Sequence, residues 1–124
     1  MNKHRLGAWG EGVAAEYLRE KGYEILSRNW RSPEGEIDLV ALDGDTFVFV
    51  EVRTRSSDTF GTPEESLTQR KRHRLKLAGL AYLDAMQAYE SMWRIDVVAI
   101  EVTSSGAVKR LDHYEDAIDG SVKT

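Results

Sequence analysis

The sequence predicts an α/β fold in which helices flank a mixed β-sheet. Segments with the apolar spacing of helices alternate with strand-like segments, in the order helix, three strands, helix, one or two strands. One strand-like segment, Phe47–Val50, is apolar throughout, as expected of a strand that is covered on both faces. This order suggests a small α/β sandwich with a mixed central sheet.

A chain of 124 residues fits one domain, and no linker or internal repeat divides residues 1–124. We expect the tail from about Asp116 to be loose. No apolar run approaches the roughly 20 residues that span a membrane, and the N-terminus lacks the apolar core of a signal peptide. The absence of cysteine is compatible with the cytoplasmic location that we predict.

The first predicted element is a helix from Leu6 to Lys21, with apolar residues at helical spacing and Gly22 at the cap position. Its opening turns contain Gly7, Gly10 and Gly12, each of which costs up to about 1 kcal/mol relative to alanine. Two interpretations stay open. The helix has a frayed start, or the glycines permit close approach of another backbone or a ligand near Glu11.

A strand over Tyr23–Arg31 and a hairpin over residues 34–55 are predicted next, with the turn at Asp43-Gly44-Asp45. Two-residue loops allow two registers. A loop at 43–44 pairs Asp38 with Phe49, whereas a loop at 44–45 pairs Asp38 with Glu51. In either register these two carboxylates share one face, within about 5–8 Å of each other. A three-residue loop would instead place them on opposite faces unless a bulge corrected it. Phe47, Phe49, Glu51 and Arg53 are expected to share a face as well.

The second half predicts a turn of helix at residues 62–65 and a longer helix that Thr68 caps and that runs to about Tyr89. Its expected apolar stripe consists of Leu75, Ala78, Tyr82, Ala85, Met86 and Tyr89. A strand over Trp93–Val102 and an edge-like strand over Val108–Tyr114 follow. Asp96, inside an apolar strand, is expected to make a structural hydrogen bond. The histidines His4, His73 and His113 show no metal-ligand spacing and are expected to be solvated, and the tryptophans Trp9, Trp30 and Trp93 to belong to the core.

The paired carboxylates are the main functional signal. Like charges that face each other across a ladder destabilise it, and a carboxylate at the end of an apolar strand is costly to bury. A divalent cation removes both penalties, and Mg²⁺ prefers one or two carboxylates together with water and phosphate oxygens. The alternative is a pair of ordinary surface carboxylates in salt bridges with Arg53.

Several motifs in order along the chain resemble a known family. Asp38 followed by Glu51-Val52-Arg53, with a glutamate on a preceding helix, resembles the PD-(D/E)XK nuclease superfamily. The segments G-x-x-G-E, E-I-D-L-V-A, F-V-E-V-R-x-R and T-x-x-K-x-x-R-L resemble the small bacterial YraN-like family within it. This resemblance runs from about Gly7 to Tyr114. It implies a restriction-endonuclease-like (tRNA endonuclease-like) α-β-β-β-α-β core and an activity compared with that of Holliday-junction resolvases.

The resemblance also implies roles for individual residues. Asp38, Glu51 and the carbonyl of Val52 would bind Mg²⁺ or Mn²⁺, and Glu11 would complete the acidic site. Arg53 stands where the superfamily motif usually has lysine. Lys71 matches the lysine at the start of the second helix and would face the phosphate.

Charge is distributed unevenly. Residues 1–76 are neutral overall, and residues 77–124 carry the whole net charge of −4. The basic run at the start of the longer helix is locally unfavourable there unless an anion binds. We therefore expect Lys71 to contact phosphate, while a solvated face and a nucleic-acid contact stay open for its neighbours. The predicted nucleic-acid-binding residues are Lys71, Arg70, Arg72, Arg74 and Arg55.

These features favour a metal-dependent endonuclease that hydrolyses DNA phosphodiester bonds, on branched or otherwise structured DNA. A second hypothesis is a nucleic-acid-binding module that keeps the fold but has little or no catalytic activity, which Arg53 and the acidic net charge favour. A third is a structural or interaction protein with ordinary salt bridges. No membrane partner is expected. Analogy with junction resolvases, which need two active sites to cut two strands, suggests a homodimer.

Overall fold

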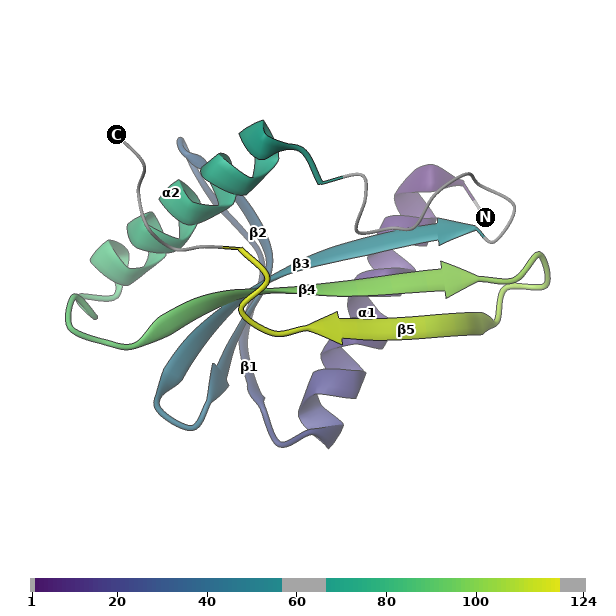
Figure 1. The fold of residues 1–124 in the computed structure, drawn as a ribbon, viewed down its shortest axis with the longest axis horizontal. Coiled ribbons are helices and arrows are strands. Elements are labelled where there is room, and N and C mark those ends of the chain that lie inside the picture. Colours follow the sequence, from purple (N-terminus) through teal and green to yellow (C-terminus); the bar gives the residue numbers. More distant parts are fainter. Residues whose placement is uncertain (1, 57–66, 119–124) are drawn as a thin grey trace.

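The computed structural model describes residues 2–56 and 67–118. These residues form two helices and a five-stranded sheet, in the chain order α1 (Lys3–Glu20), β1 (Glu24–Ser32), β2 (Gly35–Asp43), β3 (Thr46–Ser56), α2 (Gln69–Ala85), β4 (Trp93–Val102) and β5 (Val108–Tyr114). The predicted mixed sheet with flanking helices is confirmed, and the element order contains the expected α-β-β-β-α-β core (Figure 1). Neither helix in the described ranges has the length and apolar content needed to cross a membrane.

The strands lie in sequence order across the sheet, β1-β2-β3-β4-β5. The pair β3–β4 is parallel because the chain passes through α2 between them, and the other neighbours are antiparallel. One face of the sheet packs against α1 through a core that includes Leu18, Val50 and Ile100. The other face packs against α2 through Phe49, Ile95 and Tyr82. Strand β3 is therefore covered on both faces, as its apolar run predicts.

The hairpin β2–β3 adopts the second of the two predicted registers. Asp43 pairs with Thr46, Gly44 has a φ of 60° in the turn, and the ladder continues to Leu39 opposite Val50. One residue further along, Asp38 and Glu51 lie side by side at the point where regular pairing gives way to a side-chain contact. The hairpin thus brings the two carboxylates together at one end of the ladder.

Helix α1 begins three residues earlier than predicted, because Asn2 caps it by accepting a hydrogen bond of 2.8 Å from the amide of Arg5. The frayed-start interpretation is therefore wrong. Gly10 permits a close approach, since a Cβ at this position would lie 1.9 Å from Oγ1 of Thr54 on β3. By contrast, a Cβ at Gly7 or Gly12 would meet no atom of the described residues within 4 Å.

Helix α2 begins as predicted and ends earlier than predicted. Oγ1 of Thr68 accepts a hydrogen bond of 3.2 Å from the amide of Lys71, which confirms the cap. The helix ends at Ala85, and Gln87 has a φ of 55°, so the chain turns before Tyr89. The expected apolar stripe is therefore wrong at its end, where Ala85, Met86 and Tyr89 are exposed. The helical turn predicted at residues 62–65 lies outside the described residues.

The start of the C-terminal tail is ordered, contrary to expectation. The amide of Asp116 donates to Asp96 over 2.9 Å, the amide of Ala117 donates to the carbonyl of Ile95 over 2.8 Å, and Ile118 is buried. These contacts attach residues 116–118 to β4. The remainder of the predicted tail, residues 119–124, lies outside the described residues.

Replacement by alanine should have opposite effects on stability at Gly10, which contacts β3, and at Gly12, which contacts no described residue. We expect Gly10→Ala to lower the free energy of unfolding by about 1–3 kcal/mol, because the new methyl group would overlap Thr54. Gly12→Ala is the matched control and should raise it by about 0.5–1 kcal/mol, because the new methyl group meets no atom of the described residues and alanine is the better helix former. Urea unfolding measures both, and equal effects of the two substitutions would contradict this account of the helix–sheet contact.

Candidate active site

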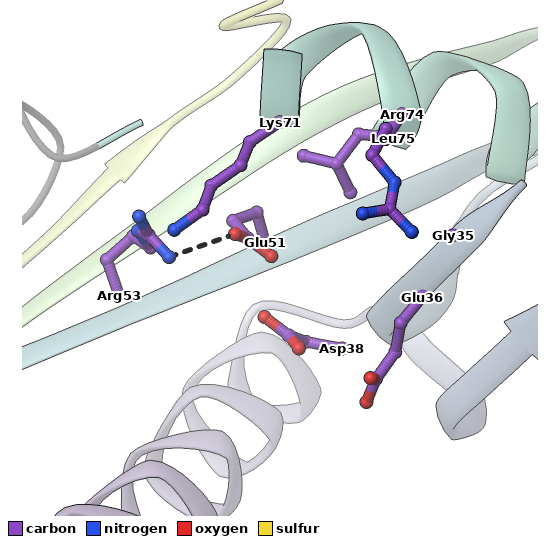
Figure 2. Close-up of a pocket in the computed structure, with 8 residues that line it drawn as sticks. All are labelled: Gly35, Glu36, Asp38, Glu51, Arg53, Lys71, Arg74 and Leu75. Atoms are coloured by element: carbon purple, nitrogen blue, oxygen red, sulfur yellow. Dashed lines mark hydrogen bonds and ion pairs between the residues drawn. The ribbon is translucent and has the colours of Figure 1, made fainter. Parts of the chain in front are cut away.

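Asp38 on β2 and Glu51 on β3 form the centre of an open cleft. Figure 2 shows their carboxylates close together, with Lys71 reaching toward them from α2. The remaining residues that line this cleft are Gly35, Glu36, Arg53, Arg74 and Leu75. The described residues of β2, β3 and α2 thus bring together the carboxylates and the cationic side chains that the sequence separates by up to 38 positions.

Asp38 is held by the backbone of the neighbouring strand. Its Oδ2 accepts a hydrogen bond of 2.8 Å from the amide of Val52. Burial, the charge of Glu51 and a hydrogen bond shared with Glu51 raise the pKa of Asp38 to about 8, although the bond from Val52 acts in the opposite direction. Without a cation, this pair of acids therefore retains a proton near neutral pH.

Glu51 forms an ion pair with Arg53, which is two residues further along the same strand. The distance from Nη1 of Arg53 to Oε2 of Glu51 is 3.3 Å, and the side chains are only 18% and 13% exposed, respectively. Both side chains line the same cleft, and Phe47 and Phe49 contribute to the core on the α2 side. The predicted shared face of these alternating residues is confirmed.

Glu11 reaches the same region from the opposite helix. It lines a cleft with Asp38, Glu51, Val52 and Lys71, so side chains from α1 and α2 meet there. Burial and the charge of Asp38 raise the pKa of Glu11, while a hydrogen bond from Asn29 and the charge of Arg28 act against them. The described residues contain no group of three or more His, Cys, Asp or Glu side chains that could hold a metal ion as they stand. Asp38 and Glu51 are the two carboxylates that lie side by side.

The predicted nucleic-acid-binding residues occupy different positions. Lys71, Arg74 and Arg55 line the clefts around Asp38 and Glu51. Arg72 donates from Nε to the carbonyl of Leu67 over 3.1 Å, and Arg70 lies on the exposed surface of α2. Lys71 and Arg74 are consequently the members of the basic run that face the carboxylates.

Lys3 and Gly7 also line these clefts. The sequence prediction did not include Lys3, whereas Gly7 was one of the glycines for which close approach of a ligand stayed open. The spacing of these residues in the sequence could have indicated that they lie close to Glu11. Residues 3, 7 and 11 recur every fourth position of α1 and so lie on one helical face with Glu11. The expected helix start at Leu6 excluded Lys3 from that face.

A second polar cluster lies on β4 and β5, and here one prediction is confirmed and one is wrong. Asp96 is fully buried and makes the expected structural hydrogen bonds, to Arg94, His113 and the amide of Asp116. Burial would raise the pKa of Asp96, but these hydrogen bonds outweigh it and hold the pKa below its usual range. His113 was expected to be solvated, yet its side chain is only 3% exposed and its Nε2 lies 2.7 Å from Asp96. The three tryptophans are partly buried against the two core clusters, as predicted.

The raised pKa of Asp38 predicts a pH-dependent stability. Since the folded-state pKa of about 8 exceeds the ordinary value of 3.8, the native state binds this proton more tightly than the unfolded chain does. Its contribution to stability is therefore full below about pH 4 and is lost as the pH rises through about 8. Asp38→Asn removes this dependence and keeps an oxygen for the amide of Val52.

We expect Asp38→Asn to melt higher than wild type above pH 8 in metal-free buffer, by about 1 kcal/mol or more, which is roughly 3–6 °C in Tm. The gain should vanish near pH 4. Calorimetry of both proteins across this range measures the difference, with the exposed Asp45→Asn as control. A difference in Tm that is the same at all pH values would contradict the assignment.

Comparison with known proteins places the chain in a family. The model of a family described as uncharacterised protein family UPF0102 matches residues 10–100. A UPF0102 protein of Pelotomaculum thermopropionicum is 49% identical over 112 residues, which cover 90% of this chain and 93% of that protein. A UPF0102 protein of Carboxydothermus hydrogenoformans is 41% identical over 119 residues, covering 96% and 99%, respectively. The chain therefore belongs to the UPF0102 family, the YraN-like family that its motifs indicate.

Proposed function

We propose that this protein is a metal-dependent endonuclease that hydrolyses phosphodiester bonds in DNA. The observation that carries the proposal is the meeting of Asp38 and Glu51 at the end of one hairpin, in an open cleft that Lys71 and Arg53 also line. Two carboxylates beside two cations form an arrangement suited to a divalent ion and a phosphate together. The resemblance to the PD-(D/E)XK superfamily supports the same activity.

The donor set fits a hard divalent cation. Asp38 and Glu51 offer carboxylate oxygens of the kind that Mg²⁺ and Mn²⁺ prefer. Burial and the neighbouring charge of Glu51 raise the pKa of Asp38, and a bound cation would favour the ionised form of both acids. Glu11 and the carbonyl of Val52 would complete the site, as the resemblance implies. A bound Mg²⁺ or Mn²⁺ would supply Lewis-acid polarisation of the phosphoryl oxygen and a more acidic water.

The protein's own cations provide the complementary half of the chemistry. Lys71 and Arg53 would bind the phosphate and stabilise the negative charge that develops on it. Arg53 has a fixed fork of donors but stays protonated, so it cannot accept the proton of the attacking water. That role falls to Glu11 or Glu36, both of which line the surrounding clefts.

A second function has a specific observation in its favour. Arg53 occupies the position of the usual lysine and is in an ion pair with Glu51, one of the proposed metal ligands. An arginine held in this way would weaken cation binding, which favours a nucleic-acid-binding module with the same fold and little or no cleavage. The proposals for branched DNA and for a homodimer rest on the resemblance to junction resolvases.

Metal binding tests the endonuclease against the two roles that need no bound cation. We expect wild-type protein to bind Mn²⁺, and the Asp38→Asn, Glu51→Gln double variant to bind it at least about tenfold more weakly, a loss of about 1.4 kcal/mol. Titration followed by electron paramagnetic resonance measures free Mn²⁺. The charge-matched control is Asp45→Asn, Glu90→Gln, which removes two exposed carboxylates outside the cleft. Equal affinities of all three proteins would contradict the metal-dependent endonuclease.

Cleavage separates the enzyme from the binding module. We expect wild-type protein with Mn²⁺ to cut labelled linear, flapped or branched DNA, and Arg53→Ala to be about 100-fold slower, as for the loss of one transition-state donor. Arg53→Lys should retain more activity than Arg53→Ala because it keeps a cation at this position. If wild-type protein binds all three DNAs in Mn²⁺ and cuts none, the endonuclease proposal is wrong and the binding module stands.

A further inference from the structure

Adjoining hollows extend the candidate active site along helix α1. The cleft at Asp38 and Glu51 shares four residues with a second hollow, which reaches α1, and that hollow shares Lys3, Gly7 and Glu11 with a third. The third hollow is also lined by Arg31 and Glu36 of the sheet. These hollows therefore form one surface groove, from Lys71 and Arg74 on α2, past the carboxylates, to Lys3 on α1.

Packing among the described residues does not explain why position 7 of this groove is a glycine. It lies well inside α1, where glycine costs about 1 kcal/mol relative to alanine. Gly10 is required by its contact with Thr54, but a Cβ on Gly7 would meet no atom of the described residues within 4 Å. Gly7 lines the two hollows that flank α1, so its missing side chain leaves bare helix backbone on the groove surface.

The charges on this part of the groove suit an anionic ligand. Nη2 of Arg28 lies 3.9 Å from Oε1 of Glu11. Nε of Arg31 lies 3.6 Å from Oε2 of Glu36, so each acid has an arginine partner on β1. Within residues 2–56 and 67–118, Lys3 takes part in no ion pair, and it is an exposed residue that lines the groove. Lys3 thus adds a positive charge at a place where Glu11 and Glu36 are already paired with arginines.

We propose that a nucleic-acid strand crosses helix α1 at Gly7 and that Lys3 pairs with one of its phosphates. This inference rests on the proposed function, because the same strand would place another phosphate at Asp38, Glu51 and Lys71. The glycine allows the sugar-phosphate backbone to approach the helix closely. The lysine contact positions the strand without reading its sequence. Lys3 and Gly7 are accordingly positioning residues for the substrate.

The lysine contact has a readout that a structural role would not change. We expect Lys3→Ala to weaken binding of fluorescein-labelled branched DNA about three- to tenfold, measured by fluorescence anisotropy in Ca²⁺. The slope of log K against log salt should fall in magnitude by about 0.7–0.9, the value for one lost phosphate contact. Lys109→Ala is the charge-matched control, since Lys109 is exposed on β5 outside the groove, and it should leave the slope unchanged.

The glycine is tested by a pair of helix substitutions. Gly7→Ala and Gly12→Ala both add a methyl group that meets no described atom, so both should raise Tm. Only Gly7 lines the groove, so only Gly7→Ala should weaken DNA binding. Higher stability together with weaker binding cannot result from misfolding.

The outcomes are distinguishable. If wild-type protein binds and cuts DNA while Lys3→Ala and Gly7→Ala match their controls, the strand does not cross α1, and the proposed function stands without this inference. If wild-type protein binds no DNA, both fail. Weaker binding in both variants, with unchanged controls and a reduced salt slope for Lys3→Ala, supports the crossing.

Discussion

The hydrogen bond from the amide of Val52 to the carboxylate of Asp38 is the contact on which the site depends. It lies just beyond the last regular pair of the hairpin, Leu39 with Val50. At this point the side chain of Asp38, and no longer the backbone of β2, accepts a hydrogen bond from the backbone of β3. That exchange satisfies a backbone donor and at the same time fixes a carboxylate beside Glu51. The cost is a partly buried pair of acids, visible in the raised pKa of Asp38.

Strand β3 connects this site to the fold. Its apolar half is buried between the two core clusters, and its polar half carries Glu51 and Arg53 into the cleft. The parallel pairing with β4 runs along β3 from Phe47 to Ser56, so the polar half is supported on one side even where β2 has separated from it. Glu51 is consequently held by the paired strands β3 and β4, and Asp38 on β2 is attached to β3 through the amide of Val52.

The sequence predicted the fold well because its signals were local. Turn residues and alternation located the hairpin and its face, and Thr68 marked the start of α2. The register stayed open because both loop positions satisfy the same turn chemistry. The end of α2 was wrong because Met86 and Tyr89 continue the helical spacing after the chain has turned. The clefts involve contacts between α1, α2 and the sheet, and no local pattern specifies these. For the same reason, neither the burial of His113 against Asp96 nor the position of Lys3 could be predicted.

The buried cluster around Asp96 has a consequence for how this domain tolerates change. His113 on the edge strand β5 accepts at Nδ1 from Lys21 of the loop after α1, while its Nε2 contacts Asp96 on β4. Asp96 in turn accepts from the amide of Asp116, at the start of the C-terminal segment. None of these side chains lines the hollows around Asp38 and Glu51. The contacts of this cluster are therefore separate from the side chains that line the groove. Substitutions in the groove can thus change or abolish ligand binding, while the hydrogen bonds around Asp96 keep the fold intact.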